Sequence, residues 1–296
     1  MLVESPGFSQ LHVDVARFAT DDFNLFHDPH KWHRLAGNPY GGPIVLGFQM
    51  ETWVAEAVAA YRHTHDDPAL LARLRFSHYQ IHFAAALKPG QRFNLTIKPS
   101  HWDEGQKGLS NRLLLRSDQG IVLMGHHRLT QEPLVLAEKM EQLPELCALP
   151  DRSEVMGYFL KRKFMMTANA KNFLLGCLVD PIQYFDELAA RTAFPEIFPV
   201  SYISCALLER AWREGHDFER APMVYTYHEI SIDRKVGAEI KSNDPLHLLV
   251  APENSSEGRK RFRCLGLIRN DLLFQARIEL MPLAEIVRAM GRSKTA

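Results

Sequence analysis

The chain has 296 residues, 46% of them hydrophobic, which is enough material for two cores of ordinary domain length. Lys plus Arg and Asp plus Glu both number 35, so the net charge is zero. No long basic tract favours a nucleic-acid or anionic-membrane partner. The N-terminus lacks a signal-peptide pattern, and no run of about 18 apolar residues occurs, so we expect a globular, cytoplasmic protein.

The first half of the chain predicts an opening strand, an irregular stretch at Phe18–His27 and then a largely apolar helix over residues 43–57. Phe76–Phe83 has the aromatic and β-branched composition of a strand. Leu113–Met124 has the pattern of two apolar strands joined by a short polar turn. These segments predict one long buried helix followed by antiparallel strands.

The second half repeats this order. The Pro-apolar opening at Pro199 introduces a second apolar helix that ends near Trp212, Tyr225–Ile232 corresponds to the first long strand, and Leu265–Phe274 corresponds to the strand pair. Such a repeat predicts an α+β protein built from two copies of a curled sheet around a central helix. We expect domains at residues 1–140 and 153–296, joined by a linker within residues 132–152.

This order of elements resembles the hot-dog fold, and its duplication resembles the double hot-dog arrangement of the MaoC-like hydratases and dehydratases. Asp22, Asn24 and His27 reproduce the D-x-N-x-x-H core of the (R)-specific enoyl-thioester hydratase motif. The residues Pro43-Ile44-Val45-Leu46-Gly47 stand where that family opens its central helix. The resemblance therefore covers two linked motifs in the right order.

The resemblance implies a lyase that interconverts 2-enoyl and 3-hydroxyacyl thioesters. Hydration of the double bond needs a base for water, an acid for Cα and donors for the enolate oxygen. In the family the aspartate and the histidine grip one water, which assigns those roles to Asp22 and His27. Asn24 would orient the loop or the substrate. The N–H of Gly47, at the start of the long helix, suits the thioester oxygen because it lacks an intrahelical partner.

Simpler interpretations of the same residues stay open. Asp22 could cap a short helix, in which case His27 would be a buried histidine with a structural hydrogen bond. Gly47 could serve the turn chemistry of any buried helix entered through glycines and a proline. Leu46 stands where the hydratases usually carry histidine.

The second half contains no second copy of the motif. Thr167–Leu174 aligns with it and places Leu174 opposite His27, so we expect a degenerate site. The second half would then supply a wall for the acyl or pantetheine part of the substrate, which needs apolar surface.

Glu51 supports a rival interpretation. The stretch from Asn38 to Glu51 resembles the helix of the β-hydroxyacyl carrier-protein dehydratases, with Asn38 in place of their histidine. A helix carboxylate also serves as base or nucleophile in many hot-dog thioesterases. The alternatives are therefore an acyl thioesterase that uses Glu51, or an acyl-thioester-binding protein without catalysis. Glu51 could also be a hydrogen-bonded glutamate without a chemical role.

Neither a cofactor nor a metal is expected. His27, His30 and His33 lie only loosely on one face, and Pro29 interrupts the turn. The four cysteines lie far apart and form no CxxC pair: Cys147, Cys177, Cys205 and Cys264. The expected partner is the thioester substrate, carried by coenzyme A or by an acyl carrier protein of fatty acid or polyketide metabolism. The protein is expected to be a monomer or a homodimer.

Overall fold

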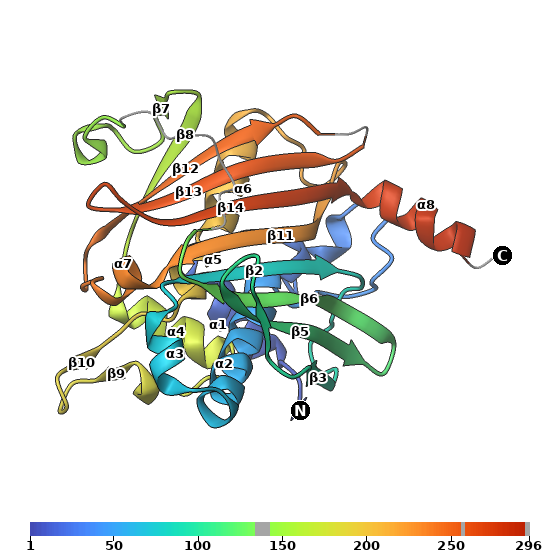
Figure 1. Cartoon of the computed structure of the whole chain (residues 1–296). Coiled ribbons are helices and arrows are strands. Elements are labelled where there is room, and N and C mark those ends of the chain that lie inside the picture. Colours follow the sequence, from blue (N-terminus) through green and yellow to red (C-terminus); the bar gives the residue numbers. More distant parts are fainter. Residues whose placement is uncertain (134–142, 256–257, 294–296) are drawn as a thin grey trace.

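The computed structural model describes residues 1–133, 143–255 and 258–293. Its main feature is one 12-stranded antiparallel sheet, in the described part of the chain, with the order β1-β3-β5-β6-β2-β11-β14-β13-β12-β8-β7 and β4 paired to β5. In Figure 1 the sheet lies in front of α5 and α6, and α8 extends away from it at the right. The first five strands in this order repeat in mirrored order after β2, so the predicted α+β architecture with two curled halves is confirmed.

The first half contains the following elements: β1 (Leu2–Ser5), α1 (Gln10–Ala19), η1 (Leu25–His27), η2 (Trp32–Arg34), α2 (Gly47–His65), α3 (Pro68–Arg73), β2 (Phe76–Phe83), β3 (Phe93–Ile97), β4 (His101–Asp103), β5 (Gly108–Ser117) and β6 (Gly120–Thr130). The second half begins with η3 (Leu146–Ala148), β7 (Glu154–Val155), β8 (Tyr158–Phe164), α4 (Thr167–Gly176), η4 (Pro181–Gln183), β9 (Phe185–Asp186) and β10 (Arg191–Thr192). It continues with α5 (Ile197–Ser201), α6 (Ile203–Arg213), β11 (Met223–Asp233), α7 (Arg234–Ala238), β12 (Pro245–Glu253), β13 (Lys260–Ile268), β14 (Asp271–Pro282) and α8 (Leu283–Ser293).

The two repeated strands pair with each other and join the halves. β2 and β11 run antiparallel, with partners from Tyr227 opposite His82 to Asp233 opposite Phe76. Because antiparallel neighbours are related by a local twofold axis, the end of β2 lies beside the start of β11. Each half therefore meets the other at both ends of this strand pair.

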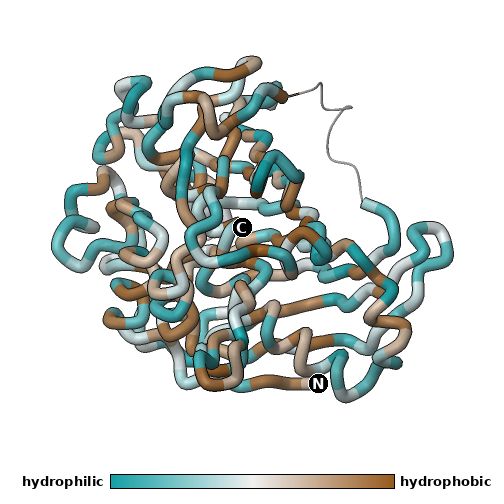
Figure 2. Tube along the Cα trace, turned by 90° about the vertical axis from the view of Figure 1, so that its left-hand side faces the viewer, coloured by the Kyte–Doolittle hydropathy of each residue, from teal (hydrophilic) through white to brown (hydrophobic). Residues whose placement is uncertain are grey.

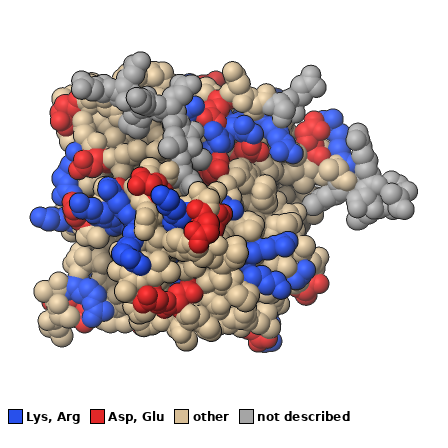
Figure 3. Space-filling view, viewed as in Figure 1, with Lys and Arg blue, Asp and Glu red and all other residues tan. Residues whose placement is uncertain are grey.

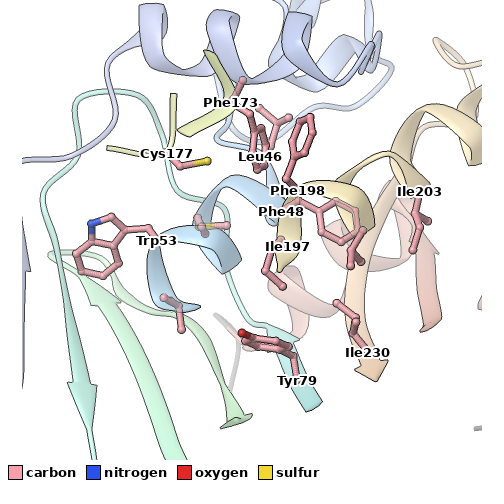
Figure 4. Close-up of a cluster of buried hydrophobic side chains, with 14 of the residues drawn as sticks. Leu46, Phe48, Trp53, Tyr79, Phe173, Cys177, Ile197, Phe198, Ile203 and Ile230 are labelled. Carbon is pink, nitrogen blue, oxygen red and sulfur yellow. The ribbon is translucent and has the colours of Figure 1, made fainter. Parts of the chain in front are cut away.

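The core is continuous across the halves. Phe48 of α2, Phe198 of α5 and Ile230 of β11 are all buried in one hydrophobic cluster, which Figure 4 shows together with side chains of α4. Figure 2 shows hydrophobic stretches inside the trace and hydrophilic stretches at its outer turns. Because the halves share this core, we expect them to unfold together.

Ion pairs cover part of the outer surface of the sheet. Arg277 of β14 contacts Glu229 of the neighbouring strand β11 at 2.8 Å and Glu253 of β12, two strands away, at 2.9 Å. On the face in Figure 3, lysine and arginine side chains lie close to aspartate and glutamate side chains. This mixed surface agrees with the zero net charge of the chain.

The second helix differs from the predicted single helix. It forms two pieces, α5 and α6, which meet at Tyr202. At this junction the Ser201 hydroxyl donates to the carbonyl of Phe198 at 2.6 Å, and the Cys205 thiol donates to the carbonyl of Tyr202 at 3.1 Å. Such side-chain bonds compete with the regular helical pattern.

The expected alignment of Thr167–Leu174 with the motif was wrong. These residues form α4, which packs against α1 and follows its half's strand β8 just as α1 follows β1. Both helices end before a residue with positive φ, Asp21 at 53° and Leu178 at 59°. A short 3-10 helix then follows in each half. Residues 177–184 therefore correspond to the motif. The sequence pattern did not reveal this because α4 is as long as the stretch Phe18–His27, so the two segments align without a gap.

Part of the predicted linker, residues 134–142, lies outside the described residues. Within the described ranges, no helix combines the length and the hydrophobicity that a membrane crossing requires.

His78 on β2 predicts a loss of stability in acid. Burial, and secondarily the charge of Arg128, lowers the pKa of His78 to about 4, and its Nε2 lies 2.7 Å from the hydroxyl of Thr130. The unfolded chain binds this proton near the ordinary pKa of about 6.5, so stability falls as the pH drops from about 6.5 towards 4. His78→Gln should make that fall shallower by about 3 kcal/mol in urea unfolding. The exposed His63→Gln is the control, and equal slopes in both variants would contradict the assignment.

Candidate active site

The motif loop follows α1 and is held by its own polar side chains. Asp22 is 4% exposed, and its Oδ1 accepts from the backbone N–H of Asn24 at 2.9 Å. Asn24 is the residue that caps the short helix η1, because its Oδ1 accepts from the N–H of Phe26 at 3.2 Å. The capping role that the sequence left open for Asp22 thus belongs to Asn24.

His27 ends that short helix and is oriented by a backbone carbonyl. Its Nδ1 lies 2.8 Å from the carbonyl oxygen of Ile44, and the side chain is largely buried. Because a carbonyl oxygen can only accept, Nδ1 carries the proton in this contact. This leaves Nε2 as the ring nitrogen that can exchange a proton with a ligand.

Gly47 is the first residue of α2, and Leu46 is its N-cap without a side-chain hydrogen bond. The N–H at this position has no partner within the helix and lies at the positive end of the helix dipole. A Cβ on Gly47 would lie 3.2 Å from Cζ of Phe83 and 3.6 Å from Cε1 of His228. The glycine therefore keeps the helix start open to a close approach.

A pocket of about 690 Å³, including the space at its open mouth, brings three of the predicted residues together. Asn24, His27 and Gly47 all line it, whereas Asp22 and Glu51 do not. Its remaining wall comes from η1, the loop before α2, α2 itself, the end of β2 with the chain that follows, the start of β11 and α8: Phe26, Tyr40, Ile44, Val45, Met50, Phe83, Ala84, Ala85, Ala86, Leu87, Met223, Val224, Tyr225, Thr226 and Ile286. The site is thus built from both halves of the chain.

An apolar hollow continues from this pocket. It encloses about 590 Å³ and shares Asn24, Phe26, Met223 and Tyr225 with the pocket. Its other walls are mainly apolar side chains from α6, β13, β14 and nearby loops: Leu35, Leu207, Leu208, Ala211, Phe218, Pro222, Phe262 and Leu280, together with His216 and Lys260. This composition suits an apolar chain.

Asp22 also bonds to the second half. The Ser204 hydroxyl of α6 donates to Asp22 Oδ2 at 2.6 Å, and the Ser204 and Tyr225 hydroxyl oxygens lie 3.0 Å apart. Neither Ser204 nor Tyr225 was a predicted site residue. No spacing in the sequence could indicate this contact, because the three residues lie on a loop, a helix and a strand that meet only in the folded chain.

Glu51 lies behind the pocket wall. Its Oε1 is 3.0 Å from Nδ1 of His228, and both side chains are fully buried. The His228 ring stacks on Phe48 and meets Phe83 edge-on, with centroids 4.7 and 4.9 Å apart. Glu51 Oε2 and His228 Nε2 have no hydrogen-bond partner among the described residues. His228 was missed because it lies within a segment that reads only as a strand.

A second cavity occupies the matching position in the other half. It encloses about 1310 Å³ and is lined by Gln183, the residue that takes the place of His27 at the end of its 3-10 helix. Val179 takes the place of Asp22, next to the matching positive-φ residue. Its lining is mainly apolar but also includes the charged side chains Glu56, Arg62 and Glu196. Tyr184 donates to Glu56 there, and burial followed by the charge of Glu196 raises the pKa of Glu56 even though the Tyr184 bond opposes the shift.

The described residues contain no group of three or more His, Cys, Asp or Glu side chains arranged to hold a metal. His27 is bonded to a carbonyl, and His30 is exposed and uses its backbone N–H on Asp28.

Comparison with known proteins identifies the fold. No family model and no curated protein matches the sequence. Among solved structures, a conserved hypothetical protein of Mycobacterium tuberculosis described as having a double hotdog fold superposes with a TM-score of 0.58 at 10% identity, covering 95% of this chain and 96% of that one. A putative MaoC domain protein dehydratase of Chloroflexus aurantiacus gives 0.57 at 9% identity, over 95% and 93%.

A MaoC-like dehydratase of Phytophthora capsici gives a TM-score of 0.53 at 10% identity, over 94% of each chain. The chain therefore has the double hot-dog fold of MaoC-like dehydratases.

Proposed function

Starting from this double hot-dog fold, we propose that the protein is a hydratase or dehydratase that interconverts 2-enoyl and 3-hydroxyacyl thioesters of coenzyme A or of an acyl carrier protein. The observation that carries the proposal is the pocket that joins His27, Asn24 and the Gly47 helix start. Three different chemical functions, a proton-exchanging ring, an amide and a free backbone donor, meet there beside an apolar hollow.

The roles follow from chemistry. The thioester oxygen would accept from the N–H of Gly47, where negative charge develops in the transition state. His27, oriented through Nδ1, would present Nε2 to the reacting water or to Cα. Asp22 would be the base, and Asn24 would fix the loop that carries both. The acyl chain would enter the apolar hollow, where the second half would hold it. The domain at residues 1–140 would then carry the catalytic motif, and the domain at residues 153–296 would bind the acyl chain.

The thioesterase alternative is less well supported. A carboxylate that acts as base or nucleophile must reach the substrate, and Glu51 does not line the pocket. The other alternative, an acyl-thioester-binding protein without catalysis, is tested by the same assay.

The assay uses crotonyl and longer 2-enoyl thioesters of both carriers. Loss of the enoyl chromophore without release of free thiol is expected. Thiol release that depends on Glu51 would replace the proposal with a thioesterase. Stabilisation by the thioester without turnover would replace it with a binding protein.

Gly47→Ala tests the helix start. The new Cβ would press on the Phe83 ring at 3.2 Å and narrow the approach to the backbone donor. We expect kcat/KM for the enoyl thioester to fall about 100-fold, in line with the removal of one such donor. Gly237→Ala, on α7, serves as control because it lies outside the pocket and its new Cβ would come no closer than 3.7 Å to another atom, Cδ1 of Leu273. Unchanged kcat/KM in Gly47→Ala would remove Gly47 from the site.

A further inference from the structure

Tyr225 is a second-half residue at the boundary between the pocket and its apolar hollow, both of which it lines. Its ring is fixed edge-on against Phe48 and His228, with centroids 6.2 and 4.8 Å away. The ring therefore has little freedom, and its hydroxyl is held towards Ser204.

Two hydrogen bonds connect Tyr225 to Ser204 and Ser204 to Asp22, and their directions follow from the available donors. Ser204 has one hydroxyl proton, and it is donated to the carboxylate of Asp22 at 2.6 Å. The 3.0 Å contact between Ser204 and Tyr225 must therefore be donated by Tyr225. All protons point towards Asp22. The lone pairs of the Tyr225 oxygen are left as the acceptor at the far end of this hydrogen-bond series from Asp22.

The protonation of Tyr225 agrees with this direction. Burial, and then the charge of Asp22, raises the pKa of the Tyr225 hydroxyl well above its ordinary value. The phenol thus stays protonated around neutral pH and can pass a proton only by receiving another at the same time.

We propose that Tyr225 is a catalytic residue that contacts the reacting water and relays its proton through Ser204 to Asp22. The proposal rests on the proposed hydratase function. It explains how Asp22 acts on a pocket that it does not line. It also gives the second half a further role. Besides forming part of the pocket wall, the second half would supply Tyr225 and Ser204, through which Asp22 acts as the base.

The atoms and protons balance as follows. The water oxygen bonds to Cβ of the enoyl thioester while one O–H bond of the water breaks. That proton goes to Tyr225, the Tyr225 proton goes to Ser204, and the Ser204 proton goes to Asp22. The electron pair of the double bond takes a proton at Cα from Nε2–H of His27, which enters the step as an imidazolium and keeps its Nδ1 proton on the carbonyl of Ile44. After the product leaves, Asp22 loses the proton that it accepted and His27 regains the proton that it gave, both by exchange with solvent.

The experiment compares Tyr225→Phe, Ser204→Ala and the double variant in enoyl thioester hydration. Both single variants keep the surrounding packing and remove one hydroxyl from the relay. We expect kcat to fall about 100-fold in each, with KM nearly unchanged, because a general-base contribution is lost while binding is retained. The double variant should be no slower than either single variant, since groups that act as a unit are not additive.

A second readout follows the protons themselves. The wild-type rate in mixtures of light and heavy water should depend on deuterium fraction in a curved way, because several protons move together, and Tyr225→Phe should make the dependence linear. Tyr227→Phe is the matched control: it removes a hydroxyl from the same strand, and its ring lies against His82, away from the pocket. Its kcat should be that of the wild type.

The proposal is overturned if the wild type hydrates enoyl thioesters and Tyr225→Phe keeps kcat within about threefold, or if only KM rises, which would make Tyr225 a binding residue. Independent, multiplicative losses in the double variant would also overturn it. A wild type that consumes no enoyl thioester would contradict the proposed function itself, which is a different result.

Discussion

His27→Gln is expected to lower kcat/KM for enoyl thioester hydration by about 1000-fold, the middle of the range for loss of a general acid or base. Glutamine can still donate to the carbonyl of Ile44, but it cannot exchange a proton near neutral pH. The substitution also has a precedent in this chain, because Gln183 occupies the matching position of the second half. Steady-state kinetics with crotonyl thioesters measure the effect.

The control for this prediction is His30→Gln, an exposed histidine three residues further along the same loop. It should retain wild-type kinetics. If His27→Gln hydrates the substrate within a factor of about ten of the wild type, His27 is not the proton-exchanging group, and its bond to Ile44 is only structural.

The second large effect is on stability, at the buried Glu51–His228 pair. His228→Leu should lower the free energy of unfolding by about 3–5 kcal/mol, because it leaves the Glu51 carboxylate fully buried without its partner. The double variant Glu51→Leu with His228→Leu should recover much of this loss, since an apolar pair needs no hydrogen bonds. Urea unfolding at neutral pH measures both.

Glu104→Ala, at an exposed position, should change stability by no more than about 0.5 kcal/mol. A loss below about 1 kcal/mol in His228→Leu would mean that the pair contributes little to the fold. A double variant less stable than His228→Leu would show that the two side chains are needed for packing rather than for each other.

Much of the fold could be predicted from local patterns. The strand Phe76–Phe83 was predicted with the bounds that β2 has, and Tyr225–Ile232 lies inside β11. The two strand pairs form the hairpins β5–β6 and β13–β14. These predictions succeeded because β-branched and aromatic composition, and the polar turns between the runs, act over a few neighbouring residues.

The helices were harder to place. The first apolar helix starts at Gly47 and extends to His65, several residues beyond the predicted end. The second is interrupted at Tyr202, and the segment predicted to match the motif is instead α4. A buried helix that is apolar on most sides has no strong periodicity, so its ends and its breaks depend on contacts elsewhere in the chain.

The candidate site shows the same division. The sequence by itself determined the repeat, the position of Asn24 and His27 on one short loop, and the free donor of Gly47, because each depends on nearby residues. Only the tertiary structure decided that Glu51 faces His228 behind the pocket and that Asp22 meets Ser204, which in turn meets Tyr225. The two contacts that join the halves link residues far apart in the sequence: Glu51 and His228 are separated by 177 positions and Asp22 and Ser204 by 182. They exist because β2 and β11 pair antiparallel and bring the end of one half against the start of the other.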